Sequence, residues 1–400
     1  MKKSLAIIGG GASALMLASQ LDERKFDVTI YERNAALGRK LLVAGKGGFN
    51  LTHSEAKELF ISRYTPDFFF KNIILEFSNI DLTKWFSEIG INTYIGSSKR
   101  VFPVKGIKPI DILNTMIINL NKKNISIKTN YIWKGWKNEN LIFETNNETK
   151  YIKPDIIVFA LGGGSWKVTG SDGSWTNYFI EKGIEIIPFQ ASNCAFEIKW
   201  NADFLKKSEG KQLKNISITC GNTTKKGEAV ITKFGLEGGV IYALSNELRK
   251  QLNTNQQANI LLDLKPQLTV DEIKKKFYQR GNRSIKKMLN DLLHINDTAV
   301  ELLKSILTKE QFTDVDMLAH CIKQLPLTVT SAAPIDEAIS TVGGISLIEI
   351  NTDFQLKKMP ANYVIGEMLN WDAPTGGYLL QACFSMGYCL ASELNKLFSV

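Results

Sequence analysis

The stretch that decides the fold is KKSLAIIGGGASALMLASQLDERKFDVTIYE, which runs from Lys2 to Glu32. A short apolar segment at residues 5–8 is typical of a buried strand, and three glycines follow it directly. Apolar residues at helical spacing predict a helix over 12–21, and residues 26–31 predict a second strand that ends in an acid. Strand, glycine turn, helix, strand and acid in this order form half of a dinucleotide-binding unit.

Each part of this unit has a physical role. Gly9 permits the tight turn after the strand, and Gly11 leaves room for a pyrophosphate to approach the backbone. Ala14 stands at the third glycine position, where only a small residue lets the helix pack closely on the strand. The first helical turn, with Ala12 and Ser13, offers free N–H groups and a positive dipole end to phosphate. The alternative is a strand-to-helix turn with no ligand.

The acid that ends the second strand indicates which dinucleotide binds. Glu32 lies 21 residues after Gly11, a spacing that suits a carboxylate accepting from both ribose hydroxyls. This favours FAD or NAD over NADP, whose 2′-phosphate the carboxylate would repel. Arg33 follows directly and weakens that preference, and it is itself a candidate cofactor contact.

Length and composition bound the class of protein. The chain has 400 residues, so we expect one large domain or two to three ordinary ones, and 44% hydrophobic residues can bury a sizeable core. The formal net charge is +9 without a run of five like charges. Such a balance permits nucleic-acid contact but does not require it, and we expect no nucleic-acid partner. Nothing in the sequence indicates an oligomeric state.

The cysteine pattern favours a protein with reduced thiols, and the lack of a long apolar run argues against a membrane span. No CxxC pair or Cys/His cluster occurs, so we expect no metal site. No 18-residue apolar run indicates a membrane span, and the N-terminal apolar stretch lacks a signal-peptide cleavage site. We therefore expect a cytoplasmic protein with five free thiols, at Cys194, Cys220, Cys321, Cys383 and Cys389.

A second informative stretch, LGRKLLVAGKGGFNLTH, runs from Leu37 to His53. Its glycines are rich in free backbone N–H groups, and two cations precede them. Together they form an anion cradle that can hold the same pyrophosphate from its other side. The alternative is a solvated basic loop. The candidate cofactor contacts in this stretch are Arg39, Lys40, Gly47, Asn50 and Leu51.

With these motifs the sequence resembles the BaiN/YhiN-like flavoproteins, known as NAD(P)/FAD-dependent oxidoreductases and as aminoacetone oxidase-like proteins. The resemblance covers nearly the whole chain. The family loop commonly reads SGGGRCNVTN where this chain has AGKGGFNLTH, so the chain looks like a divergent subgroup. The resemblance rests on residues 9–14, on LGRKLLVAGKGGFNLTH, on RVFPV at 100–104, on ALGGGSWKVTGSDG at 160–173, and on GEMLNWDAPTGGYLLQACFSMGY at 366–388.

The resemblance implies an α/β fold in which an insertion splits the FAD/NAD(P)-binding Rossmann-like domain. Residues 190–265 give short alternating segments that predict a small β-barrel or sandwich, and 269–323 read as helices. The expected FAD-binding domain covers 1–189 and 343–400. A β-barrel-like insert covers 190–268 and 324–342, and it carries a helical insert at 269–323.

Within the first segment of the expected FAD-binding domain, a helical stretch is followed by strands. Residues 55–125 read as mostly helical, and the resemblance implies that Arg100–Pro103 is a loop across the active face. Residues 125–133 read as one strand, on which Ile132 is our candidate contact for the adenine. The alternating residues of 133–151 predict a β-meander.

Two further stretches are candidates for cofactor contact. The apolar run 156–160 predicts a buried parallel strand that opens into glycines, with Ala160, Leu161 and Gly162 next to the cofactor. A crossover turn without a ligand is the alternative. Near the C-terminus a strand, an acid and a glycine pair precede a helix over 378–398, whose positive end would face the N1–C2=O edge of a flavin. The contacts expected there are Gly366, Glu367, Asp372, Thr375, Gly376, Gly377 and Tyr378. A C-terminal packing helix with an ordinary cap is the alternative.

The sequence therefore favours an FAD-dependent oxidoreductase that passes a hydride or an electron pair between flavin and a small organic substrate. NAD(P)H is a candidate electron donor, although no second GxGxxG unit occurs. His53 and Tyr378 are the candidate catalytic acid or base, with a structural role as the alternative for each. We expect the insertion to cover the flavin ring and shape the substrate pocket. The other functions considered are a flavoprotein that binds or modifies RNA and a flavin-binding regulatory protein without turnover.

Overall fold

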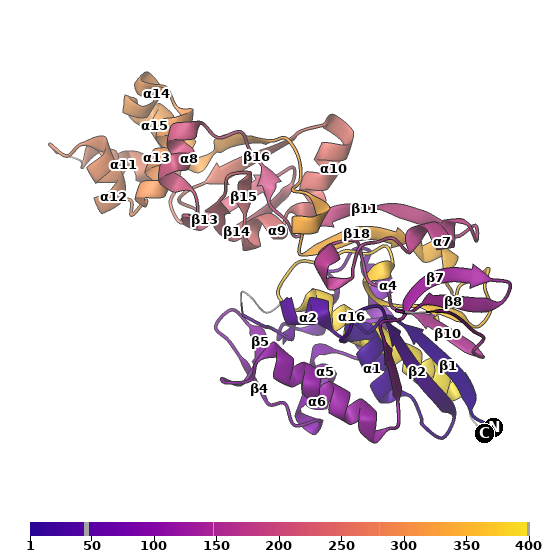
Figure 1. Cartoon of the computed structure of the whole chain (residues 1–400). Coiled ribbons are helices and arrows are strands. Elements are labelled where there is room, and N and C mark those ends of the chain that lie inside the picture. Colours follow the sequence, from indigo (N-terminus) through magenta and orange to yellow (C-terminus); the bar gives the residue numbers. More distant parts are fainter. Residues whose placement is uncertain (44–47, 147, 280, 398–400) are drawn as a thin grey trace. The chain divides into compact units, whose positions relative to one another are not determined.

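A computed structural model describes residues 1–43, 48–146, 148–279 and 281–397. The chain forms two compact units. The first unit is Met1–Gln190 with Ile339–Val400, and the second unit is Ala191–Ala338. Each unit has its own buried hydrophobic cluster. Figure 1 shows the helices and strands of both.

A parallel sheet forms the centre of the first unit. Its strand order is β19-β10-β1-β2-β6, and every neighbouring pair runs parallel. All four residues of β10 are buried, as expected for a strand covered on both faces. The strands are β1 (Lys3–Ile8), β2 (Phe26–Glu32), β6 (Ser126–Thr129), β10 (Ile156–Phe159) and β19 (Asn362–Val364).

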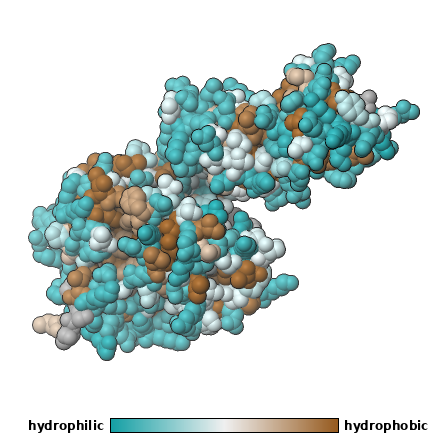
Figure 2. All heavy atoms as spheres, turned by 180° about the vertical axis from the view of Figure 1, so that it is seen from behind, coloured by the Kyte–Doolittle hydropathy of each residue, from teal (hydrophilic) through white to brown (hydrophobic). Residues whose placement is uncertain are grey.

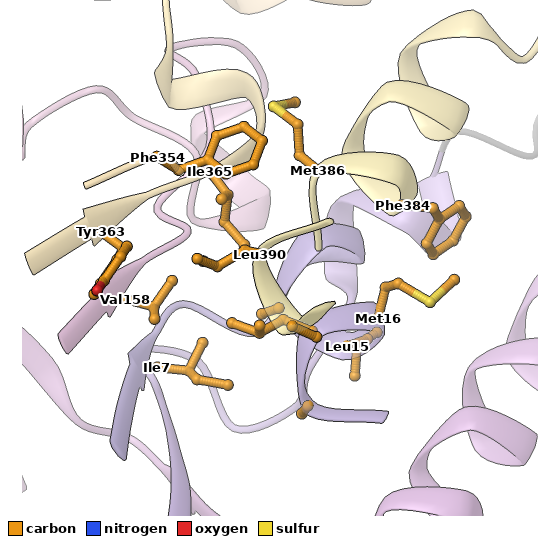
Figure 3. Close-up of a cluster of buried hydrophobic side chains, with 14 of the residues drawn as sticks. Ile7, Leu15, Met16, Val158, Phe354, Tyr363, Ile365, Phe384, Met386 and Leu390 are labelled. Carbon is orange, nitrogen blue, oxygen red and sulfur yellow. The ribbon is translucent and has the colours of Figure 1, made fainter. Parts of the chain in front are cut away.

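Two helices pack against this sheet and against each other. Figure 3 shows Ile7 and Val158 of the sheet next to Leu15 of α1 (Ala12–Gln20) and Leu390 of α16 (Tyr378–Leu397). Helix α1 follows the glycine turn at the position predicted from the sequence. Burial of these apolar side chains supplies most of the stabilising free energy of this layer.

Shorter elements surround the sheet. The meander predicted at 133–151 is confirmed as β7 (Ile132–Lys137), β8 (Asn140–Glu144) and β9 (Thr149–Ile152). A second three-stranded sheet contains β3 (Thr52–His53), β5 (Arg100–Pro103) and β4 (Thr93–Ile95). The helices are α2 (Arg39–Val43), α3 (Lys57–Ile61), α4 (Asp67–Glu76), α5 (Asn79–Glu88), α6 (Pro109–Lys122) and α7 (Thr176–Ile180).

Two details of the sequence interpretation are wrong. Residues 100–103 are not a loop but the strand β5, in which alternate side chains are buried. The expected single strand over 125–133 is two strands in different sheets. Asn130, at φ +58°, turns the chain between them, and asparagine is one of the few residues that tolerate this conformation.

The chain leaves the first unit and returns to it on neighbouring strands. β11 (Ile186–Ser192) and β18 (Ser340–Ile345) form a two-stranded sheet. Gly343 and Gly344 in β18 have positive φ, and a Cβ on either would lie within 2.5 Å of a backbone oxygen. Only glycine therefore fits at this crossing.

The second unit is built on an antiparallel sheet. The strand order is β12-β15-β14-β13-β16-β17, and the bridge between Phe196 and Ala332 nearly closes it into a barrel. The strands are β12 (Phe196–Glu197), β13 (Gln212–Cys220), β14 (Thr223–Ile231), β15 (Gly235–Glu237), β16 (Ala258–Asp263) and β17 (Leu325–Val329). The predicted fold class, a Rossmann-like α/β domain with a barrel-like insertion, is confirmed.

Helices accompany this sheet, and a group of them lies between β16 and β17 in the sequence. Several of their N-termini are capped by side chains, for example by that of Thr269, which accepts from the Glu272 backbone N–H. They are α8 (Ala202–Ser208), α9 (Gly239–Tyr242), α10 (Ser245–Asn255), α11 (Val270–Tyr278), α12 (Ile285–Asp291), α13 (Asp297–Ile306), α14 (Lys309–Thr313) and α15 (Val315–Lys323).

The surface is largely polar. On the face shown in Figure 2, hydrophilic residues predominate and apolar residues form separate groups between them. Within the described ranges, no helix combines the length and the apolar character needed to cross a membrane. The same residues contain no group of three or more His, Cys, Asp or Glu side chains that could hold a metal ion.

Candidate functional site

The glycine turn after β1 contains two glycines of different kinds. Gly9 has φ +102°, and a Cβ there would lie 2.4 Å from the carbonyl oxygen of Ala160, so the protein itself requires glycine. Gly11 has φ −84° and ψ −172°, a conformation open to any residue, and a Cβ there would meet no atom within 4 Å. The fold gives no reason for glycine at position 11. A ligand that approaches the backbone does give one, and a pyrophosphate fits it.

The first turn of α1 lies in close contact with α16. Ala14 is fully buried and Ser13 nearly so, whereas Ala12 is partly exposed. A Cβ on Gly387 of α16 would lie 2.4 Å from the Ser13 carbonyl oxygen. Small residues on both helices therefore permit this approach, and the free N–H groups of α1 are held in a fixed position.

Glu32 reaches back to the glycine turn. Its Oε2 accepts from the Gly10 N–H at 2.8 Å, and its Oε1 accepts from the backbone and side-chain nitrogens of Asn34 at 2.8 and 2.7 Å. A carboxylate has about four acceptor positions, and three are used within the protein. The side chain is buried at the carboxyl end of β2, next to the turn, where a ribose is expected in this fold.

The arginines predicted to contact the cofactor have partners within the protein. Nη1 of Arg33 lies 2.8 Å from Oδ2 of Asp172, and Arg39 donates to Oδ1 of Asn34 at 2.9 Å. Burial raises the pKa of Asp172, but hydrogen bonds from Ser174 and from Arg33 outweigh it and hold this pKa below the ordinary value. These contacts fix the loop after β2 against the stretch after β10.

Lys40 joins three separate parts of the chain. Its Nζ lies 2.8 Å from Oε2 of Glu367 and donates to Oγ of Ser165 at 2.9 Å. The other carboxylate oxygen of Glu367 accepts from the Thr341 N–H at 3.1 Å. Two residues predicted as cofactor contacts therefore form one partly buried ion pair, and Ser165 and Thr341 complete it.

The stretch after β10 lies directly beside the glycine turn. Ala160 donates its N–H to the Ile8 carbonyl at 2.8 Å. Gly162 has φ +74°, and its carbonyl accepts from Nε1 of Trp175 at 3.0 Å. Ala160, Leu161 and Gly162 are all partly exposed. The predicted second contact stretch therefore stands next to the first at the carboxyl edge of the sheet.

The C-terminal motif closes the same edge. Gly366 has φ +87°, and a Cβ there would lie 2.6 Å from Oγ of Ser13. Asp372 is buried; its Oδ1 accepts from the Ala373 N–H, and its backbone pairs with that of Thr65. Thr375 is partly exposed.

The helix that follows begins at two glycines. Gly376 and Gly377 have φ +118° and +100°, and a Cβ on Gly377 would lie 2.5 Å from the Thr52 backbone. The start of α16 is thereby pressed against β3.

His53 and Tyr378, the two catalytic candidates, lie side by side. Their rings are stacked with centroids 5.3 Å apart. The Tyr378 hydroxyl donates to Oε1 of Glu55 at 2.6 Å, and Arg63 donates two hydrogen bonds to the same carboxylate, at 3.0 and 2.9 Å. Asn79 donates to the His53 carbonyl at 2.7 Å.

The protonation of this group follows from burial and from these partners. Burial raises the pKa of Glu55, but hydrogen bonds from Arg63 and Tyr378 hold it below the ordinary glutamate value. Burial, with the hydrogen bond to Glu55, raises the pKa of Tyr378 far above that of a free tyrosine. Burial lowers the pKa of His53. Near neutral pH the carboxylate is charged while the phenol and the imidazole are neutral.

The remaining predicted contacts are placed as follows. Leu51 is buried and donates its N–H to the Val101 carbonyl at 2.8 Å, and Asn50 is partly exposed. Ile132 lies on β7 and is exposed. Gly47 falls outside the described residues.

Several residues of this region escaped the sequence interpretation. Glu55, Arg63 and Thr341 lie in none of the quoted motifs, and Ser165 lies in one without being singled out; their partners are distant along the chain or lie on another element. For Arg100 the sequence predicts only a place in a loop, whereas the strand β5 sets it against Gly376. The alternation of the RVFP stretch was the available signal for that strand.

Comparison with known proteins places the chain in a family. The model of the HI0933-like protein Rossmann domain matches residues 3–393. The chain is 23% identical to the 3-dehydro-bile acid delta(4,6)-reductase of Clostridium scindens, over 96% of this chain and 97% of that one. It is 24% identical to the ribosomal RNA dihydrouridine synthase of Haemophilus influenzae, over 98% of each chain.

A solved structure supports the fold. The 3-ketosteroid-Δ4-(5α)-dehydrogenase of Rhodococcus jostii aligns with a TM-score of 0.50 at 10% identity, covering 98% of this chain and 96% of that one. At this identity the likeness concerns architecture alone. The resemblance found in the sequence is confirmed by the family match. The chain belongs to the HI0933-like Rossmann-domain family, and within it to the BaiN/YhiN-like group that the sequence indicates.

Proposed function

We propose that this protein is an FAD-dependent reductase of carbon–carbon double bonds that are conjugated to a carbonyl group. The proposal is supported mainly by the reaction that two relatives have in common. A reductase of 3-dehydro-bile acids at delta(4,6) and a synthase of dihydrouridine both saturate such a bond. Both relatives match over nearly the full length, so the shared chemistry belongs to the shared architecture.

The residues around the carboxyl edge of the sheet fit FAD. Gly11 and the first turn of α1 would receive the pyrophosphate, and Glu32 would receive the adenosine ribose. The stretches 160–162 and 366–367 would line the ribityl chain, and the glycine-opened start of α16 would face the flavin. Ile132, next to the loop after β2, is the proposed neighbour of the adenine.

The reaction saturates the substrate's double bond. The carbon β to the carbonyl gains a hydride, the carbon α to it gains a proton, and negative charge passes through the carbonyl oxygen in between. When bound, reduced FAD supplies the hydride, and NADH or NADPH is the proposed reductant that renews it. The chain itself has to supply the proton and a site that positions the carbonyl.

Of the two catalytic candidates, we favour His53 as the proton donor. The Tyr378 proton is engaged with Glu55 at 2.6 Å, and the raised pKa keeps it there. The Nδ1 atom of His53 accepts from the Glu55 N–H at 3.2 Å, so neutral His53 carries its proton on Nε2. The imidazole is partly exposed, as a group that meets substrate has to be. Tyr378 then serves to position it by stacking.

The test uses the purified protein with its flavin reduced in the absence of oxygen. The probes are 2-cyclohexen-1-one, a 3-keto-Δ4 steroid and, as a control without the conjugated bond, cyclohexanone. We expect the enones to reoxidise the flavin and to appear as products with two added hydrogens, while cyclohexanone does nothing. The proposal is overturned if none of the two enones, uridine and RNA reoxidises the reduced flavin. Comparing the rates at which NADH and NADPH reduce the oxidised flavin identifies the electron donor.

A second candidate is the same reaction on uridine within RNA, and one feature of the second unit favours it. Residues 274–287, which we call the basic segment, contain seven Lys and Arg and no Asp or Glu. Lys275, Lys276 and Lys287 are exposed or partly exposed, and Tyr278 between them is 78% exposed. Cations interleaved with an exposed aromatic ring are typical of surfaces that contact single-stranded RNA.

The two candidates are separated by neutralising part of the basic segment. The variant Lys275→Gln/Lys276→Gln/Lys287→Gln should bind ribosomal RNA more weakly than wild type. The slope of the logarithm of the binding constant against the logarithm of the salt concentration should become shallower by roughly 0.7–0.9 for each phosphate contact that is lost. A matched variant, Lys206→Gln/Lys211→Gln/Lys214→Gln, removes three exposed lysines elsewhere in the second unit. Equal RNA binding by both variants and wild type would remove this candidate, and enone reduction should be unchanged in both.

A further inference from the structure

Arg100 is an isolated cation at the edge of the candidate site. In β5 the side chains of Val101 and Pro103 are buried, so those of Arg100 and Phe102 point to the other side. The pairing of β5 with β3 sets Arg100 opposite His53. Across the described part of the chain, the Arg100 guanidinium forms no hydrogen bond and no ion pair.

The guanidinium lies at the start of α16. A Cβ built on Gly376 would be 3.5 Å from Nε of Arg100, which is ordinary contact. Glu55, whose N–H donates to His53, has its carboxylate already engaged with Arg63 and Tyr378. A guanidinium that is partly exposed and has no protein partner is available to a ligand that carries negative charge.

The direction of α16 shows which part of a bound FAD would reach Arg100. Helix α16 runs parallel to α1, because Gly387 lies at Ser13 and Asn395 bonds with Gln20 and Asp22. The start of α16 at Tyr378 is nine residues before Gly387. At about 1.5 Å per residue, this places it roughly 13 Å beyond the glycine turn. A ribityl chain that extends from a pyrophosphate on the turn along this direction would reach this end of α16.

We propose that Arg100 faces the N1–C2=O edge of the flavin and stabilises the negative charge that this edge carries after reduction. The inference rests on the proposed binding of FAD and adds a residue to that site. Arginine suits the role because its planar fork can donate to N1 and O2 together, and because it stays charged at every working pH. The partial positive charge at the start of α16 acts in the same direction.

The experiment measures the flavin itself. Wild type, Arg100→Met and Arg100→Lys are purified with FAD, and the two-electron midpoint potential and the affinity for sulfite are determined, since sulfite binding also leaves negative charge at N1–C2=O. We expect Arg100→Met to bind sulfite at least tenfold more weakly and to have a potential lower by about 30 mV, the equivalent of a tenfold change for two electrons. Arg100→Lys should fall between the two.

Controls separate the possible failures. Lys99→Gln removes the neighbouring exposed cation, and it should change neither quantity. Should Arg100→Met not retain FAD, Arg100→Gln replaces it in the same measurements. If wild type holds FAD and the neutral variants keep its potential and sulfite affinity, the role of Arg100 is refuted while the proposed function stands. If wild type holds no FAD, the proposed function itself has failed.

Discussion

Lys40 and Glu367 are 327 residues apart in the sequence, yet Nζ of Lys40 lies 2.8 Å from Oε2 of Glu367. Lys40 belongs to α2, the helix that follows β2, and Glu367 follows β19, the last strand of the sheet along the chain. The side chains are 28% and 14% exposed. The pair therefore joins the two ends of the split domain at the edge where the cofactor contacts meet.

A double-mutant cycle measures that link. Lys40→Met, Glu367→Gln and the double variant should give a coupling free energy of about 0.5–2 kcal/mol in urea unfolding, because the pair is partly shielded from water. The exposed pair Lys396–Glu393 serves as the control, and its coupling should be near zero. A Lys40–Glu367 coupling no larger than that control would contradict a structural role for the pair.

Gly11→Val tests the glycine turn. Since a Cβ at position 11 would meet no protein atom, the fold should persist and the circular dichroism should stay close to wild type. The branched side chain would instead occupy the pyrophosphate position, so flavin content should fall steeply. Gly239→Val is the matched control, because its Cβ also meets nothing within 4 Å. Full flavin content in Gly11→Val would mean that the turn has no ligand-binding role.

His53→Asn and Tyr378→Phe distinguish the two catalytic candidates. Removing a general acid should lower the single-turnover rate of enone reduction by roughly 10²–10⁴-fold, and we expect this for His53→Asn. Tyr378→Phe removes one donor to a buried carboxylate, so it should lower the free energy of unfolding by about 1–3 kcal/mol and change the rate little. The reverse pattern in stopped-flow and urea-unfolding measurements would assign the proton to Tyr378.

The lowered pKa of His53 predicts a pH effect on stability. Burial lowers this pKa in the folded state, so below the ordinary histidine value of about 6.5 the unfolded chain binds the extra proton more readily. The His53 contribution is therefore fully present above that pH and is lost as the pH falls through the folded-state pKa. Urea midpoints of wild type and His53→Gln should converge or cross between about pH 7 and pH 5. A constant difference across this range would show that His53 titrates normally.

Local patterns made much of this fold predictable. Periodicity and the placement of glycines among neighbouring residues determine three of its parts. These are the turn from Ile8 to Ala12, the buried strand at 156–159 and the meander at 132–152. The strand at 100–103 was missed because a four-residue alternation is weak, and its partners β3 and β4 are contributed by other segments. Likewise, the sequence does not reveal that the chain turns at Asn130.

The candidate site was only partly predictable, for a related reason. Glycine-rich motifs can be recognised from the sequence, because glycine is required either by the backbone conformation, as at Gly9, or by the room that a ligand needs, as proposed at Gly11. Glu55, Arg63 and Thr341 act through side chains whose partners the fold brings from elsewhere, and no local spacing encodes such contacts. For the same reason the sequence suggested that Lys40 and Glu367 contact the cofactor but not that they contact each other.

Acid precipitation of the purified protein shows whether it binds FAD without a covalent bond. No Cys or His stands in a flavin-attachment motif, and His53, the nearest candidate, is stacked on Tyr378. If FAD is bound as proposed, the purified protein is yellow, its acid supernatant contains close to one FAD per chain, identified by chromatography, and the pellet is colourless. A colourless protein, FMN in the supernatant, or flavin that stays with the pellet would contradict the proposal.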